Sequence, residues 1–101
     1  MRYLIIDGCY GGTGIRDKYN GGYIEPIELS LSEIHISQIS KWVHRYNNEF
    51  LSQYSNKELI DLLDKEGVEI ARFLRENYSG EIKIEYYSDA KLKYLSLDQN
   101  A

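Results

Sequence analysis

Apolar residues recur at helical spacing in two long stretches in the middle of the chain. The first runs from about Ser32 to Asn48 and follows a capping-box pattern at Ser30–Glu33. The second follows a similar pattern at Ser55–Glu58 and should end at Ser79–Gly80, because glycine suits the residue after a helix. The two stretches predict a helical hairpin.

Shorter apolar patterns on either side of these helices predict strands. The run Tyr3–Ile6 is apolar on both sides, as a central strand is, and Glu81–Tyr87 alternates between apolar and charged residues. A third strand is expected at Tyr23–Leu29, confined to an edge by Pro26, and a short last helix at Ala90–Leu95. The predicted fold is α+β: a small two- or three-stranded sheet packed against the hairpin, in the order β, loop, α, α, β, α.

Length, charge and cysteine content narrow the class of protein. The chain of 101 residues fits one domain, which we place at residues 1–95 with a frayed tail at 96–101. The single cysteine can form no intrachain disulfide and the first apolar run is shorter than a signal peptide, so we expect a cytoplasmic protein that binds no membrane. The formal net charge of −4 argues against direct binding to nucleic acid and leaves a basic protein partner open.

The segment Gly8–Tyr23 is the most unusual part of the chain, since it holds six of the eight glycines. Glycine permits backbone conformations and close approaches that other residues do not, so we expect a shaped loop with a functional role. The segment is not a dinucleotide-binding fingerprint, because Asp17 stands where the third glycine would be, and no Gly-Lys-Ser/Thr closes a phosphate-binding loop. A small ligand-binding domain or enzyme that uses this loop remains an alternative.

No residues are spaced for catalysis or for metal binding. His35 and His44 lie on different faces of the first helix, and no second cysteine accompanies Cys9, which we interpret as a small buried residue. We therefore expect no catalytic residue, no metal and no cofactor.

Four residues are predicted to have structural roles. Gly67 interrupts the apolar sector of the second helix and should permit a close crossing. Glu66 projects toward the apolar stripe, so it must either find a partner, for which we suggest Arg16 or Arg45, or sit at the rim of the core. Trp42 lies at the edge of the apolar face of the first helix.

Several motifs together resemble a known group of proteins. They are GGTGIRD at Gly11–Asp17, the Gly-Tyr-Ile segment Gly22–Ile24, LSLS at Leu29–Ser32, Trp42, Tyr46, LDKEGVEIARFLRE at Leu63–Glu76 and KIEYYSDAKL at Lys83–Leu92. This series is similar to small bacterial immunity-type proteins of contact-dependent growth inhibition and other polymorphic toxin systems.

The resemblance implies a non-catalytic inhibitor that binds and neutralises a cognate toxin. Such a toxin is expected to be basic and of the nuclease type, which an acidic partner suits. A protein that discriminates one toxin from its relatives needs side chains that the fold does not require. The candidates for partner binding are Tyr10, Tyr19, Tyr23, Glu58, Asp61 and Glu69. A scaffold or regulator unrelated to toxins is a further alternative.

Overall fold

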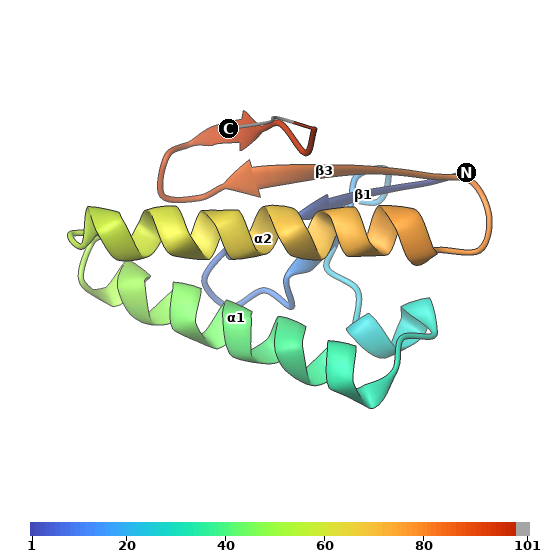
Figure 1. Ribbon diagram of the computed structural model, residues 1–101, viewed down its shortest axis with the longest axis horizontal. Helices are drawn as coiled ribbons and strands as arrows, with labels where there is room; N and C mark the ends of the chain where they lie inside the picture. The colour runs from blue at the N-terminus through green and yellow to red at the C-terminus, as the bar shows by residue number, and fades with distance from the viewer. Residues whose placement is uncertain (99–101) are drawn as a thin grey trace.

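The computed structural model describes residues 1–98 and has an α+β fold with a mixed sheet and two long helices (Figure 1). The elements are β1 (Arg2–Ile6), β2 (Ile15–Asp17), the 3₁₀ helix η1 (Pro26–Leu29), α1 (Glu33–Leu51), α2 (Lys57–Asn77), β3 (Ile82–Ser88) and β4 (Lys93–Leu95). The four strands are ordered β2-β1-β3-β4. The central pair, β1 and β3, is parallel, and each outer strand is antiparallel to its neighbour.

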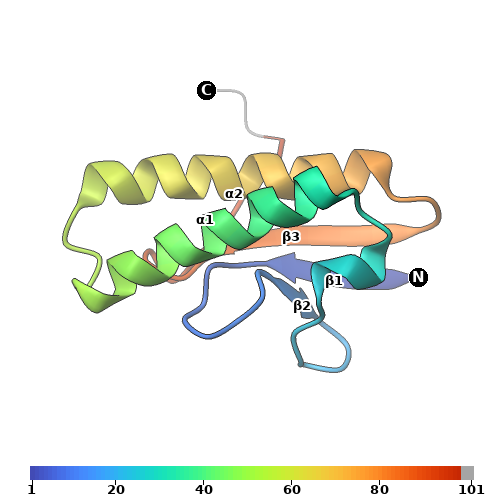
Figure 2. The ribbon, with the colours of Figure 1, turned by 90° about the horizontal axis from the view of Figure 1, so that it is seen from below.

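The helical hairpin covers one face of this sheet (Figures 1 and 2). Parallel neighbouring strands need a long connection. Between β1 and β3 this connection contains β2, η1 and the hairpin. Leu4 and Ile6 of β1 and Ile84 and Tyr86 of β3 alternate toward the helices and join the core cluster. Among residues 1–98, none of the helices has the length and apolar character needed to cross a membrane.

Both long helices begin with a side-chain cap, close to the predicted positions. The Ser32 hydroxyl accepts from the backbone N–H of His35, and the Asn56 side chain accepts from that of Leu59. The predicted capping residue Ser30 instead has a φ of 58° and ends η1. The hairpin therefore follows the sequence prediction, although α1 continues three residues further than expected, to Leu51.

Outside the hairpin and the two central strands, two predicted elements are wrong. Tyr23–Leu29 is not a strand: Pro26 begins η1, and Tyr23 makes only an isolated bridge to Arg16. Ala90–Leu95 is not a helix, because a turn brings the chain back as β4 against β3. The sheet has four strands, of which β2 and β4 were not predicted. Each is three residues long, which is too short to show an alternating pattern.

The C-terminal segment is held against α2 as far as it is described. Leu97 is buried in the core cluster, its carbonyl accepts from Arg72 Nε at 2.5 Å, and Asp98 pairs with Arg75 at 2.8 Å. The frayed tail expected from Ser96 therefore does not begin there, and residues 99–101 lie outside the described residues.

The centre of the fold depends on the absence of a side chain at Gly67. A Cβ there would lie 2.2 Å from Cε1 of Tyr86 and 2.7 Å from Cζ2 of Trp42. Trp42 is fully buried, and its indole Nε1 donates to the carbonyl of Leu63 at 2.8 Å. α2 can therefore pack closely on both β3 and α1, which is the crossing that the glycine suggests.

Candidate functional site

The glycine-rich segment forms two loops separated by β2. The first, Gly8–Gly14, runs beneath the C-terminal half of α1, and the second, 18–22, projects from the other end of β2 (Figure 2). Tyr10 lies on the first loop and Tyr19 on the second. The single functional loop expected from the sequence is therefore two regions of surface.

Asp7, at the end of β1, joins the two loops from inside. Its carboxylate is nearly fully buried and accepts from the Tyr23 hydroxyl at 2.9 Å and from the Cys9 backbone N–H at 3.2 Å. The Arg16 guanidinium lies 3.0 Å from the other carboxylate oxygen. Burial raises the pKa of Asp7, while Tyr23 and Arg16 oppose that change.

These contacts correct two predictions. Arg16 is paired with Asp7, and the partner of Glu66 is Arg45, at 2.6 Å on the partly exposed rim between the helices. Of the two partners suggested for Glu66, Arg45 is therefore the one found in the structure. Tyr23 is not a freely exposed loop tyrosine, because its hydroxyl is committed to Asp7.

The polar groups of this cluster are poorly placed for nucleophilic or metal chemistry. Burial raises the pKa of the Cys9 thiol, and the thiolate is the reactive form of cysteine. Burial also raises the pKa of Asp89, with the charge of Asp7 acting in the same direction. Within residues 1–98, no group of three histidine, cysteine or acidic side chains is arranged to hold a metal ion.

Asn47 of α1 fixes the Gly8–Gly14 loop. Its amide donates to the carbonyls of Gly8 at 3.1 Å and Cys9 at 3.4 Å, and its Oδ1 accepts from the N–H of Gly11 at 3.0 Å. Gly8 packs so closely on Tyr46 that a Cβ would lie 2.4 Å from the ring. The loop is therefore held in place although it has no regular structure.

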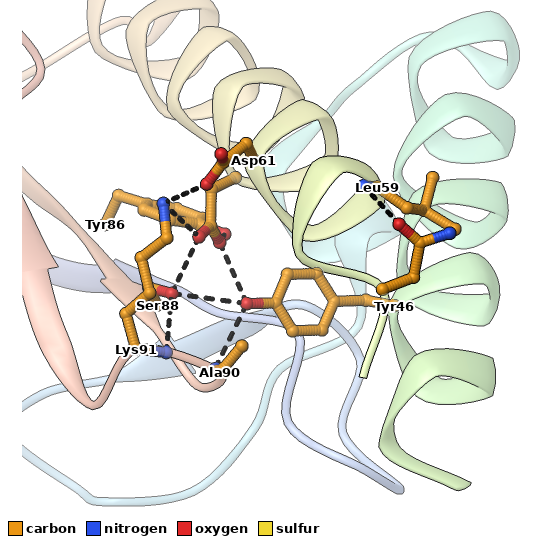
Figure 3. Close-up of polar contacts among 9 residues, drawn as sticks. Tyr46, Leu59, Asp61, Tyr86, Ser88, Ala90 and Lys91 are labelled. Carbon is orange, nitrogen blue, oxygen red and sulfur yellow. Dashed lines mark hydrogen bonds and ion pairs between the residues drawn. The ribbon is translucent and has the colours of Figure 1, made fainter. Parts of the chain in front are cut away.

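Behind this loop lies a buried polar cluster centred on Asp64 of α2. The carboxylate accepts from the hydroxyls of Tyr46 at 2.8 Å, Tyr86 at 2.6 Å and Ser88 at 2.8 Å. Lys91 reaches in from the turn after β3, with its Nζ 3.4 Å from Asp64 (Figure 3). Asp64, Tyr46, Tyr86, Ser88 and Lys91 are called the buried cluster below.

Sequence reasoning missed Asp64, although a signal was present. Ile60, Asp64, Gly67 and Ala71 follow one another at spacings of four, three and four along the buried side of α2. A carboxylate on such a stripe indicates an internal hydrogen-bond network. Glu66, the acidic residue that the sequence analysis did single out, is paired with Arg45 at the rim of the core.

A surface pocket lies directly outside the buried cluster. It has a volume of about 260 Å³ and is lined by Tyr54, Lys57, Ile60, Asp61, Ala90 and Lys91. Lys91 spans its polar side, because its Nζ also lies 2.7 Å from Asp61 at the surface. Burial raises the pKa of Tyr54 to about 12, so its hydroxyl is neutral.

Exposed apolar side chains surround this pocket at one end of the molecule. Tyr10 is 54% exposed and stacks on Phe50 with ring centroids 4.9 Å apart, and Phe50 contacts Tyr54 edge to face. The end of α1 and the β3–β4 turn lie at the same end of the molecule (Figure 1), and they add Leu51 and Leu92, both largely exposed. We define the end surface as Tyr10, Phe50, Leu51, Leu92, Glu58 and Asp61.

The structure divides the six residues predicted to bind a partner. Tyr10, Glu58 and Asp61 belong to the end surface. Tyr19 lies elsewhere, against Tyr3 of β1, and Glu69 is paired with Arg72 two turns further along α2. Phe50, Leu51 and Leu92 were not predicted, because exposed apolar residues next to a helix end cannot be told from core residues by spacing alone.

Comparisons with known proteins do not extend this description. No family model matches the chain, and no curated protein matches it. The resemblance to immunity-type proteins therefore stays a prediction.

Proposed function

We propose that this chain is an immunity protein whose end surface binds and neutralises a cognate bacterial toxin. The observation that carries the proposal is the exposed, stacked pair of Tyr10 and Phe50: Tyr10 lies on a loop that Asn47 fixes from behind, and Phe50 lies in the last turn of α1. Exposed aromatic anchors are the residues that contribute most to protein–protein affinity. The resemblance to immunity-type proteins supplies the class of partner.

Rigidity of the loop supports binding. A partner that docks on a mobile loop must order it first, which reduces the affinity. Here the Gly8–Gly14 loop is already held by Asn47 and by the contact of Gly8 with Tyr46, so little ordering is left. The pocket beside Tyr54 can receive one side chain of the partner.

The charges of the end surface suit a basic partner of the nuclease type. Glu58 and Asp61 are exposed on the first turns of α2, and the whole chain has a formal net charge of −4. Asp61 is shared with Lys91, so Glu58 is the carboxylate with less local compensation. Such charges speed association more than they strengthen the complex.

Inhibition without catalysis is supported by the orientation of the loop residues. Arg16 and Tyr23 both bond to the buried Asp7, whereas Tyr10 is largely exposed. We propose that the protein acts in the cytoplasm, needs no cofactor, and blocks the toxin by covering it.

Co-expression with the toxin domain encoded by the neighbouring reading frame tests this proposal. Cells that produce this toxin should grow when the wild-type protein is present, and growth should fail with the double variant Tyr10→Ala/Phe50→Ala. Tyr19→Ala is the matched control, because it removes an equally exposed tyrosine from a different surface and should still protect.

Two results would overturn the proposal. One is failure of the wild-type protein to protect cells or to bind the purified toxin domain. The other is turnover of a small substrate by the protein at a rate that falls with Cys9→Ala or Arg16→Ala, which would favour the ligand-binding or enzymatic alternative.

A further inference from the structure

The face of the sheet opposite the helices carries an unusual layer of tyrosines and lysines. Side chains alternate along each strand, so the residues between those of the core point to this second face. Ile5, which pairs with Glu85, is among them and is only 2% exposed. In the described part of the chain, both long helices lie on the other side of the sheet (Figure 1). We call it the open sheet face and define it as Tyr3, Lys18, Tyr19, Lys83, Glu85, Tyr87 and Tyr94.

Two lysines lie against the tyrosine rings in the middle of this face. The Nζ of Lys83 is 4.8 Å from the ring centroid of Tyr3, to which it is paired across β1 and β3. The Nζ of Lys18 is 5.6 Å from Tyr3 and 5.4 Å from Tyr94. Lys18 also donates to the Tyr94 hydroxyl at 3.3 Å, which links the two edges of the sheet.

The outer tyrosines present free ring surface. Tyr19 meets Tyr3 at an interplanar angle of 89°, and Tyr94 meets Tyr87 at 71°. In each such edge-to-face pair one of the two rings contributes only its edge. One side of the Tyr94 ring is occupied by the Nζ of Lys18. Tyr19 is 65% exposed and Tyr94 is 45% exposed.

The charge of this face differs from that of the whole chain. The strand register places one carboxylate here, Glu85, and it accepts a hydrogen bond from the Tyr3 hydroxyl. Lys18 and Lys83 are exposed and positive. The net charge of −4, which argues against nucleic acid for the chain as a whole, is an average that conceals this local excess of positive charge.

We propose that the open sheet face binds single-stranded nucleic acid. Ring faces stack on unpaired bases and ammonium groups neutralise the phosphates between them, which is the chemistry of non-specific single-strand binding. A duplex hides its base faces inside the base stack, so the tyrosine rings cannot stack on them. The inference uses a different face and different side chains from the end surface, so it stands or falls independently of the proposed function.

Fluorescence anisotropy with labelled twelve-nucleotide oligouridine and oligothymidine tests the proposal on the whole protein. We expect saturable binding at low salt, and weaker binding to a duplex of equal length. With two lysines contacting phosphates, log K should fall with log[salt] at a slope of about −1.4, since single strands give about −0.7 per phosphate.

Variants separate stacking from charge. Tyr19→Ala should weaken binding by roughly 5- to 150-fold, the loss of one stacked base, whereas Tyr19→Phe keeps the ring and should bind like the wild type. Lys18→Gln/Lys83→Gln should reduce the salt slope to near zero. Tyr10→Ala, on the end surface, is the control and should have no effect.

Three outcomes would overturn the inference. They are absence of binding at about 100 µM protein and about 20 mM salt, Tyr19→Ala binding like the wild type, and polyglutamate binding as tightly as the oligonucleotides with the same dependence on Tyr19. The last would identify the face as a surface for an acidic protein. The salt concentration is kept low because the attraction between lysines and phosphates is screened least at low ionic strength.

Discussion

Two groups of aromatic residues lie next to each other near the carboxyl ends of β1 and β3, and the molecule uses them in opposite ways. In the buried cluster, Tyr46 and Tyr86 are fully enclosed and both hydroxyls donate to Asp64. On the end surface, Tyr10 and Phe50 stack on each other and remain about half exposed. Tyrosine serves the core in one group and the surface in the other.

The difference shows how a small chain can carry a rigid binding surface. The buried cluster connects α1, α2 and β3 through one carboxylate, so the elements behind the end surface are fixed by hydrogen bonds as well as by packing. Tyr46 belongs to both regions, since its ring also supports Gly8 at the start of the loop that carries Tyr10. Substitutions in the buried cluster should therefore lower mainly the stability, and substitutions on the end surface should weaken mainly the binding of a partner.

The largest loss of stability is expected from Asp64→Ala. Removing the carboxylate leaves three buried hydroxyls without their acceptor and Lys91 without one of its partners. We expect the free energy of unfolding to fall by about 3–5 kcal/mol in urea titration. A loss below about 1 kcal/mol would mean that the buried cluster does not hold the elements together.

Gly67→Ala should have the next largest effect. The new methyl group would collide with Tyr86 and Trp42, and overpacking of this kind costs about 1–3 kcal/mol, which exceeds the gain of up to about 1 kcal/mol in helix propensity. Gly22→Ala is the matched control, because nothing lies within 4 Å of its Cβ position. Equal stability of the two variants would contradict the close crossing.

The pH dependence of stability tests the burial of Asp89, whose pKa is influenced by Asp7 and by Asp64 of the buried cluster. Because its pKa is raised in the folded state, mainly by burial, the folded protein binds a proton more readily there than the unfolded chain. This contribution favours folding at low pH and is lost as the pH rises through the folded pKa.

Urea titrations of the wild type and Asp89→Asn between about pH 7 and pH 4 measure this contribution. The stability of the wild type relative to the variant should increase as the pH falls. A difference that stays constant or decreases would show that Asp89 is not desolvated in the folded protein.

The smallest effect on stability is expected from Tyr10→Ala. The side chain is 54% exposed and its main contact, Phe50, is exposed as well. The free energy of unfolding should change by no more than about 0.5 kcal/mol, as for ordinary surface substitutions. A much larger loss of stability would show that Tyr10 acts as a core residue, and the end surface would then not differ from the buried cluster.

The helical hairpin and both central strands were predictable because each has a long pattern. α1 and α2 combine periodic apolar residues with capping side chains, and β1 and β3 have apolar or alternating runs. The short strands β2 and β4 were not, since three residues in a glycine-rich or turn-rich context carry no periodicity. Their positions are decided by pairing with β1 and β3.

The candidate site was predictable only in part, for a related reason. Tyr10, Glu58 and Asp61 could be named as residues that the fold does not need, but sequence alone could not show that Tyr23 bonds to Asp7 or that Tyr19 faces another side. Such assignments depend on which loops meet in space. Asp64 was the avoidable omission, since its position on the buried stripe of α2 was readable.

Binding rates between the purified protein and the toxin domain of the neighbouring reading frame test the central claim most directly. For Tyr10→Ala we predict dissociation faster by roughly 5- to 150-fold, the effect of losing an anchor worth about 1–3 kcal/mol, with an association rate close to that of the wild type. Tyr19→Ala should bind like the wild type. If Tyr10→Ala binds normally and Tyr19→Ala does not, the end surface is not the site at which this protein meets its partner.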